Sequence, residues 1–309
     1  MTATQFDLSF AREFAADHLG DVAGRVEPLG AGAWSQAYAV SVAGVESVMR
    51  FSDSREDFDK DAAAHQLGVL GTTVPRVDEI GSVANGYFAL SERRTGTFLE
   101  AVSAPERDAV MPDLLRTFDA LATADLAHWP GYGLWTADRS APYDSWADAL
   151  LSIDGPRPRL GDWPGALARF PYSLATFRDG TALLAELAAR LPDRHGLVHG
   201  DLLNRNVLVR GGRISAVLDW GSSMLGDTFY DAAWLVYWAP LFPGWADADL
   251  AALMIEHWSA RGDADALDVR LQAYQLHIGL DHLAYHAVTG LAPERTAAEA
   301  AGRRGVGRG

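Results

Sequence analysis

Residues 197–209 carry the sequence Leu-Val-His-Gly-Asp-Leu-Leu-Asn-Arg-Asn-Val-Leu-Val, a polar loop between two short apolar runs. Its polar residues have the spacing His-x-Asp-x-x-x-x-Asn, formed by His199, Asp201 and Asn206. A further apolar run, 214–218, follows after Gly211-Gly212. Two β-type runs around a two-residue glycine turn predict a hairpin. The stretch therefore predicts a loop whose polar side chains stand at the base of a β-hairpin.

The expected turn at Gly211-Gly212 also predicts which residues of the hairpin face each other. Asn206 would oppose Val217, and Asp219 would lie two residues further along on the same face, about 7–8 Å away. Magnesium prefers oxygen ligands and keeps several waters and phosphate oxygens. Asn206 and Asp219 are therefore candidate metal ligands, with Asp201 nearby as a candidate base. The alternative is a surface loop and hairpin with scattered polar residues.

The rest of the chain changes character along its length. Up to about residue 91 most apolar runs are of strand type, whereas Ala- and Leu-rich helical patterns dominate from about residue 103. We expect an α+β fold with a small β-rich N-terminal lobe over residues 1–91, a hinge over 92–96, and a larger, mainly helical lobe over 97–309. The expected strands cover 26–29, 37–42, 47–51, 75–77 and 87–90; the expected helices cover 5–20, 56–70, 105–127, 144–153, 173–191, 228–239, 247–260 and 267–288.

Composition excludes several classes of protein. The 309 residues are 49% hydrophobic, which is enough for a large core, and there is no cysteine for disulfides or thiol catalysis. A formal net charge of −15 repels nucleic acid. No apolar run approaches the ~18 residues of a membrane span, and the N-terminus has no secretory pattern. We expect a cytoplasmic monomer that binds neither nucleic acid nor membrane.

Two segments, 199–209 and 217–231, resemble the aminoglycoside phosphotransferases, which are antibiotic kinases with a protein-kinase-like fold. The similarity extends loosely from about residue 25 to 285. It implies a kinase-like two-lobe fold, ATP (or GTP) and Mg²⁺ as cofactors, and a nucleotide site between the lobes. It also implies Asp201 as the catalytic base and Asn206 and Asp219 as metal ligands. His199 is then a structural hydrogen-bonding residue.

The resemblance further implies a phosphate-covering turn at Gly30, Gly32 and Ser35. Glycines let the backbone approach phosphate closely, although a simple strand turn is the alternative interpretation. The resemblance also implies that Ser91-Glu92-Arg93 present backbone groups to the adenine edge.

The third expected strand places Arg50 where the general kinase pattern has lysine. Arginine can bind phosphate through two parallel hydrogen bonds, although Arg50 could equally be an exposed strand residue. The expected acidic partner on the next helix is Asp59, with Asp57 and Asp61 as rivals. All three acids could instead form a solvated helix face.

The substrate is expected to contact the helical lobe. Residues 225–290 contain nine acids and two arginines, a balance that would attract a cationic aminoglycoside, although most of these acids must simply be solvated. Trp238 offers an aromatic face to a sugar ring, and Asp281 offers a carboxylate to an ammonium group. Asp227 and Asp231 complete the candidate substrate residues. Asp227 could also cap a helix, and the resemblance gives it a supporting role toward the catalytic segment.

A protein substrate is not expected. Protein kinases have a long activation segment after an Asp-x-Gly element, but here Gly226-Asp227 follows Asp219-Trp220-Gly221 within a few residues. The leading hypothesis is an O-phosphotransferase that confers antibiotic resistance, with hygromycin B as a candidate acceptor. The alternatives are a kinase for another small hydroxylated metabolite or a macrolide, and a non-catalytic nucleotide-binding regulator.

Overall fold

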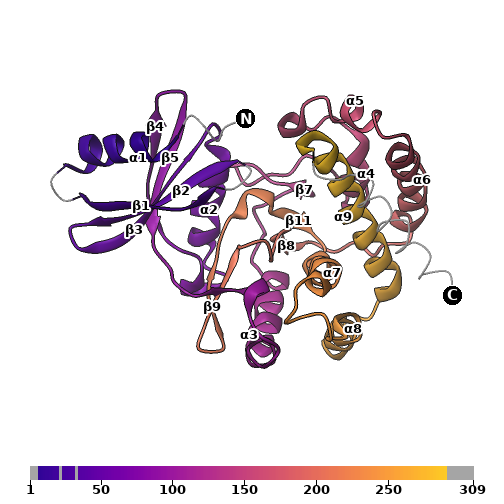
Figure 1. Cartoon of the computed structure of the whole chain (residues 1–309). Helices are drawn as coiled ribbons and strands as arrows, with labels where there is room; N and C mark the ends of the chain where they lie inside the picture. Colours follow the sequence, from indigo (N-terminus) through magenta and orange to yellow (C-terminus); the bar gives the residue numbers. More distant parts are fainter. Residues whose placement is uncertain (1–5, 21–22, 32–33, 291–309) are drawn as a thin grey trace. The chain divides into compact units, whose positions relative to one another are not determined.

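The computed structural model describes residues 6–20, 23–31 and 34–290 (Figure 1). The chain divides into two compact units. The first unit comprises Met1–Leu114 and Asn204–Ser222, and the second comprises Leu115–Leu203 and Ser223–Gly309. The expected boundaries at residues 91 and 96 stay a prediction. The first unit includes residues 204–222 because strand β9 (Val207–Arg210) pairs with β6 (Thr97–Phe98).

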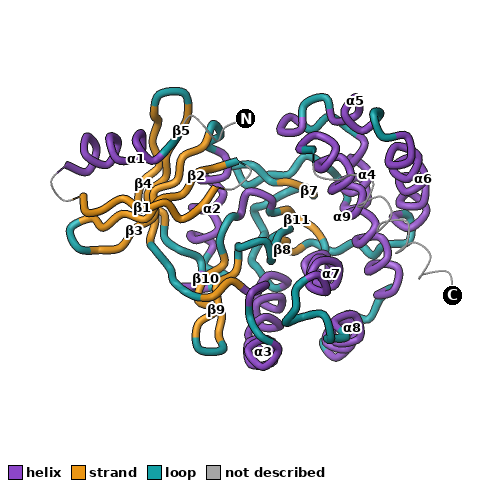
Figure 2. The backbone as a smooth tube through the Cα atoms, in the orientation of Figure 1, coloured by secondary structure: helices purple, strands orange, loops and turns teal. Residues whose placement is uncertain are grey.

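The larger sheet of the first unit is a five-stranded antiparallel sheet, in the order β1-β2-β3-β5-β4 (Figure 2). Two of its connections are tight turns, at Ala43-Gly44 and around Asn85, where positive φ angles allow the chain to reverse. The expected strand-rich N-terminal region is thus confirmed. The strands are β1 (Ala23–Ala31), β2 (Ser35–Val42), β3 (Val45–Ser52), β4 (Val77–Val83) and β5 (Gly86–Glu92).

An aromatic cluster packs helix α1 (Leu8–Phe14) onto this sheet. The rings of Phe10 and Phe14 lie 5.3 and 5.2 Å from the buried ring of Phe51. Tyr38 donates a 2.6 Å hydrogen bond from its hydroxyl to the Phe6 carbonyl. The chain continues from α1 as a π-helix (Ala15–Leu19), and helix α2 (Glu56–Leu67) follows β3.

The hairpin predicted around Gly211-Gly212 is present as β9 and β10 (Arg213–Val217), but the predicted register is wrong. Ile214 faces Val209 as expected, whereas Val217 faces Val207 because the ladder shifts by one residue at Ser215. Asn206 consequently lies opposite Leu218, whose N–H donates to the Asn206 carbonyl at 2.7 Å. Asp219 is therefore one residue beyond the position facing Asn206, not two.

The second unit is mainly helical and contains one small sheet, in the order β7-β11-β8. The long helix α9 packs against α5, α6 and α7. This confirms the α+β class. None of the described helices is long and apolar enough to cross a membrane. Besides β6, β9 and β10, the elements after β5 are α3 (Ala104–Ala122), which continues from the first unit, β7 (Gly133–Leu134), α4 (Trp146–Leu151), α5 (Trp163–Leu167), α6 (Pro171–Ala188), β8 (Gly196–Val198), β11 (Met224–Gly226), α7 (Phe229–Trp238), α8 (Leu250–Ala260) and α9 (Leu267–Thr289). Short 3-10 turns follow β5 at Leu99–Ala101, Ser152–Asp154, Pro158–Leu160, Trp220–Ser222 and Ala239–Leu241, and a further one, Gly71–Thr73, lies between α2 and β4.

Gly226 offers a test of packing in the second unit. A Cβ atom on Gly226 would lie 2.3 Å from Cε3 of the buried Trp146 ring, so Gly226→Ala must displace a large side chain. We expect the variant to lose about 1–3 kcal/mol of unfolding free energy, measured by urea denaturation. Val45→Ala, at a side chain that is 65% exposed, should change it by less than about 0.5 kcal/mol. An unchanged midpoint for Gly226→Ala would contradict this packing.

Candidate active site

The loop predicted to carry the base is held through its backbone. Asp231, in the first turn of α7, accepts hydrogen bonds from the N–H groups of His199 and Gly200, both at 2.8 Å. Burial raises the pKa of Asp231 to about 7, and the two N–H donors oppose that rise. His199 is buried, and its Nδ1 accepts a 3.2 Å hydrogen bond from the Asp201 N–H. This hydrogen bond is consistent with the structural role expected of His199, which stays a prediction.

Asp201 itself is half-buried and lies within electrostatic range of two tyrosines of the second unit. Burial and then the Asp201 carboxylate raise the pKa of Tyr285, on α9. Burial, followed by several charged neighbours that include Asp201, raises the pKa of Tyr230 on α7. The candidate base is therefore near tyrosines of both helices that carry the expected substrate residues, α7 and α9.

Asp227 has a purely internal role. Its buried carboxylate accepts two hydrogen bonds from Arg270, at 2.6 and 2.7 Å, and one from the Tyr274 hydroxyl at 2.5 Å. It also accepts from the Phe229 N–H at 3.0 Å, which satisfies a donor in the first turn of α7. Burial would lower the pKa of Arg270, but hydrogen bonding and charge from Asp227 raise it.

The assignment of Asp227 and Asp231 to substrate contact therefore needs correction. Both carboxylates are at most 1% exposed, and both are occupied by internal donors. The supporting role toward the catalytic loop that was expected of Asp227 belongs to Asp231. Asp227 instead links the start of α7 to α9.

Trp238 and Asp281 are both neighbours of His282, a residue that the sequence analysis did not assign to the substrate site. The ring of His282, next to Asp281, lies 4.6 Å from the Trp238 ring and 5.4 Å from that of Trp234. Asp281 keeps 44% of its side chain exposed and accepts a 2.8 Å hydrogen bond from Arg157. These residues form an aromatic and charged patch on α7 and α9, which we call the α7–α9 patch (Arg157, Trp234, Trp238, Asp281 and His282).

His277 lies one helical turn before Asp281 and supports this patch from below the surface. Its Nδ1 and the Tyr230 hydroxyl are 2.9 Å apart. Burial lowers the pKa of His277 to about 4, against the opposing charge of Asp281. The imidazole is therefore neutral at pH 7.

In the first unit, Arg50 forms its ion pair with Asp61 and not with Asp59, so the expected pairing is wrong. Asp59 turns to Arg55 on the exposed side of α2, at 3.1 Å. Burial would lower the pKa of Arg50, but Asp61 and the nearby Asp219 and Asp57 raise it.

Helix α2 also holds the Asp219-Trp220-Gly221 segment. The Trp220 N–H donates to Asp61 at 2.8 Å, and the Lys60 ammonium donates to the Gly221 carbonyl at 2.9 Å. Asp219 keeps an exposed surface, but desolvation by the surrounding protein and the charge of Asp61 raise its pKa, while Arg50 opposes this rise. The residue thus lies in an acidic environment that a bound cation would stabilise.

The donor chemistry of Asn206 and Asp219 fits a magnesium ion. They offer amide and carboxylate oxygens at the base of the same hairpin, and magnesium usually takes only one or two protein ligands besides phosphate and water. Within the described ranges, no group of three or more His, Cys, Asp or Glu side chains is arranged as a metal site. A ligand set with few protein groups is therefore the one that this structure offers.

The other residues expected to bind the nucleotide differ in how well their surroundings suit that role. Gly30 has φ +150°, a conformation that favours glycine, and Ser35 begins β2. Gly32 lies outside the described residues. Ser91 is buried and its hydroxyl contacts the Val48 carbonyl at 3.5 Å, while the Arg93 side chain pairs with Glu46. The side chains of Ser91 and Arg93 are thus directed to other protein groups.

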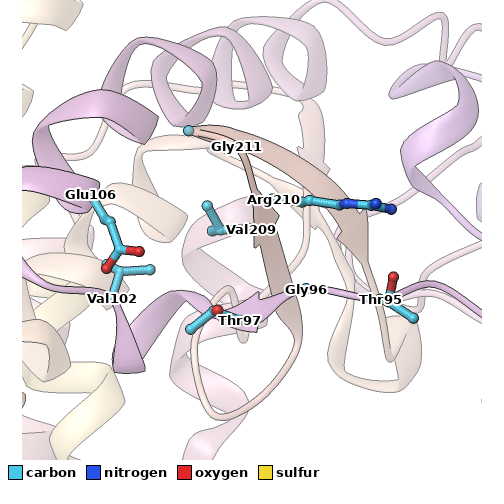
Figure 3. A pocket seen from close by; sticks show the side chains of 9 residues that line it. Thr95, Gly96, Thr97, Val102, Glu106, Val209, Arg210 and Gly211 are labelled. Carbon is cyan, nitrogen blue, oxygen red and sulfur yellow. The ribbon is translucent and has the colours of Figure 1, made fainter.

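A hollow of about 560 Å³ in the first unit is lined by none of the expected site residues (Figure 3). It lies between the segment Thr95–Thr97, the β9–β10 turn and the start of α3, with Glu106 on one side. The Glu106 carboxylate accepts hydrogen bonds from the N–H and hydroxyl of Ser103, so it caps its own helix. The hollow therefore adds nothing to the candidate site.

Comparison with known proteins agrees with this geometry. Residues 25–287 match the model of a phosphotransferase enzyme family. Hygromycin-B 4-O-kinase of Escherichia coli is 30% identical over 295 residues, which cover 94% of this chain and 81% of the relative. A thermostable mutant of aminoglycoside phosphotransferase APH(4)-Ia, in ternary complex with AMP-PNP and hygromycin B, is similar with a TM-score of 0.79 at 28% identity, over 96% of each chain. Spectinomycin phosphotransferase APH(9)-Ia, at 12% identity and a TM-score of 0.60 over 93% of this chain and 91% of its own, shares the fold.

The pairing of Arg50 can be tested with two neighbouring acids of α2. Asp61→Asn removes the partner of a largely buried guanidinium and should lower the unfolding free energy by about 3–5 kcal/mol. Asp59→Asn removes an exposed i,i+4 pair and should cost less than about 0.5 kcal/mol. Urea denaturation of both variants measures the contrast. A larger loss of unfolding free energy for Asp59→Asn than for Asp61→Asn would instead support Asp59 as the partner of Arg50.

The lowered pKa of His277 predicts a pH dependence. An unfolded histidine takes up a proton near pH 6.5, whereas folded His277 does so only near pH 4. Stability should therefore fall as the pH decreases from about 6.5 to 4, by up to about 1.4 kcal/mol per pH unit for this group. In His277→Gln, unfolding free energies measured across this range should show a shallower slope. The same change at the exposed His128 should leave the slope as it is, and equal slopes for all three proteins would refute the assignment.

Proposed function

The chain belongs to the phosphotransferase enzyme family, and from this membership we propose that it transfers the γ-phosphoryl group of ATP to a hydroxyl of an aminoglycoside, with hygromycin B as the first candidate. The relative that supports this choice most directly is named hygromycin-B 4-O-kinase. Solved structures of APH(4)-Ia contain hygromycin B together with AMP-PNP or ADP, which favours ATP over GTP as the donor.

One observation carries the proposal: the loop that bears Asp201 is held by Asp231 of α7, the helix that also contributes to the α7–α9 patch. A base and a substrate surface on the same packed elements keep their relative position during turnover. Phosphoryl transfer depends mainly on such positioning and on charge stabilisation.

In this mechanism Asp201 orients the acceptor hydroxyl and takes its proton as the oxygen attacks the γ-phosphorus, while the bond from that phosphorus to the bridging oxygen breaks and ADP leaves. Asn206 and Asp219 would hold Mg²⁺, which when bound supplies positive charge to the phosphate oxygens. Arg50 would bind the phosphates from β3, with Asp61 fixing its direction. The turn that contains Gly30, Gly32 and Ser35 would cover the phosphates.

The α7–α9 patch has the chemistry to bind an aminocyclitol. Trp238 would stack on a sugar ring, and the half-exposed Asp281 carboxylate would receive an ammonium group in addition to Arg157. We further propose that the enzyme is a monomer and that it acts in the cytoplasm, where ATP is available.

The test is a phosphorylation assay with Mg-ATP and a panel containing hygromycin B, other aminocyclitols, a macrolide and small polyols. We expect phosphorylated hygromycin B as the main product. Asp201→Asn should lower kcat by about 10²–10⁴-fold while it retains ADP binding, because it removes the base but not the nucleotide residues. Asp268→Asn, at an exposed acid of α9, is the matched control and should keep normal turnover.

Transfer only to a macrolide or a polyol would replace the substrate proposal. Magnesium-dependent nucleotide binding with no product from any acceptor would instead favour a regulator. Near-normal kcat in Asp201→Asn would remove Asp201 from the role of base.

A further inference from the structure

Arg205 has an unusual position inside the catalytic motif. It occupies one of the unspecified places between Asp201 and Asn206, and both Asn204 and Arg205 adopt positive φ angles, +55° and +71°. Such angles are uncommon for residues with side chains and mark places where the surrounding structure imposes the conformation. The guanidinium carbon of Arg205 lies 5.2 Å from the centre of the Phe98 ring, in β6, so the arginine is seated on an aromatic platform.

The same guanidinium lies against the glycine turn. A Cβ atom placed on Gly30 would be 3.6 Å from Nη2 and 3.9 Å from Nη1 of Arg205. Gly30 also has φ +150° and follows an irregularity in the β1–β2 ladder at Leu29. The arginine therefore bridges three segments of the first unit: the motif loop, β6 and the turn expected to cover the phosphates.

No carboxylate among the described residues pairs with this guanidinium. Within the described part of the chain, Arg205 forms no ion pair, whereas the guanidinium of Arg50 pairs with Asp61 and lies near Asp219 and Asp57. In a chain with a net charge of −15, an arginine left without a carboxylate next to a phosphate-covering turn is available for an anion. The guanidinium fork matches phosphate oxygens, to which it can donate two parallel hydrogen bonds.

We propose that Arg205 binds a phosphate oxygen of the nucleotide, and that Phe98 and Gly30 set the direction of its guanidinium. This role rests on the proposed function, and it adds a second phosphate-binding arginine to Arg50. Arg205 is the neighbour of the metal ligand Asn206 in the chain, so one short segment would contact both the cation and the anion of a Mg-nucleotide. Phosphate binding also explains why a cation is kept at this place in an acidic protein.

The experiment compares Arg205→Gln with the wild type by calorimetric titration with ADP and with adenosine, both in magnesium-containing buffer. Loss of a charge-assisted hydrogen bond to phosphate should raise the Kd for ADP about ten-fold. The Kd for adenosine, which has no phosphate, should stay the same, and so should the KM for the acceptor. Arg210→Gln, at the exposed end of β9, is the matched control and should bind both ligands normally (Figure 3).

Three results would overturn the assignment. An unchanged Kd for ADP in Arg205→Gln would remove Arg205 from the phosphate site. An equal loss of ADP and adenosine affinity would place the residue at the nucleoside instead. A raised acceptor KM with normal ADP binding would make it a substrate residue. A wild-type protein that binds neither ADP nor AMP-PNP would instead refute the proposed function, which separates that failure from the failure of this inference.

Discussion

The buried carboxylate of Asp231 and the two backbone N–H groups that it accepts are the contact on which the candidate site depends. A carboxylate without water is costly to bury unless donors replace its hydration, and here His199 and Gly200 supply them. The loop gains a defined backbone just before Asp201. Because Asp231 belongs to α7, every contact that fixes this helix also fixes the candidate base. The most important of these contacts is the Asp227–Arg270 pair, which links the start of α7 to α9.

In the first unit, too, an aspartate carboxylate accepts a backbone N–H beside a candidate site residue. Asp61 accepts the Trp220 N–H, so a carboxylate of α2 holds the backbone directly after Asp219. Arg50 binds the same carboxylate and thereby offsets its charge. In both units an aspartate that performs no chemistry fixes the backbone beside one that is expected to. The candidate residues can thus stay at the ends of loops, where a ligand can reach them, without being mobile.

The sequence predicted features that depend on neighbouring residues better than features that depend on contacts between distant ones. The motif loop, the hairpin and the helical second half are local patterns, and the structure confirms them. The one-residue register shift at Ser215 was missed because nothing in Arg-Ile-Ser-Ala-Val marks a bulge. The sequence offered a better partner for Arg50 than Asp59, namely Asp61. Asp57 and Asp61 are four residues apart and share the buried face of α2, whereas Asp59 lies toward the solvent beside Arg55.

The substrate residues show a limit of a different kind, since the acidic composition of residues 225–290 cannot separate solvated acids from buried ones. Asp227 and Asp231 are occupied by an arginine, a tyrosine and backbone N–H groups, so of the four acids and aromatics chosen only Trp238 and Asp281 lie in a patch with an exposed carboxylate. Arg157, which completes that patch, is 124 residues away from Asp281 in a loop without a recognisable motif. Net charge therefore indicates the kind of ligand, while the internal hydrogen-bond donors decide which carboxylates remain to bind it.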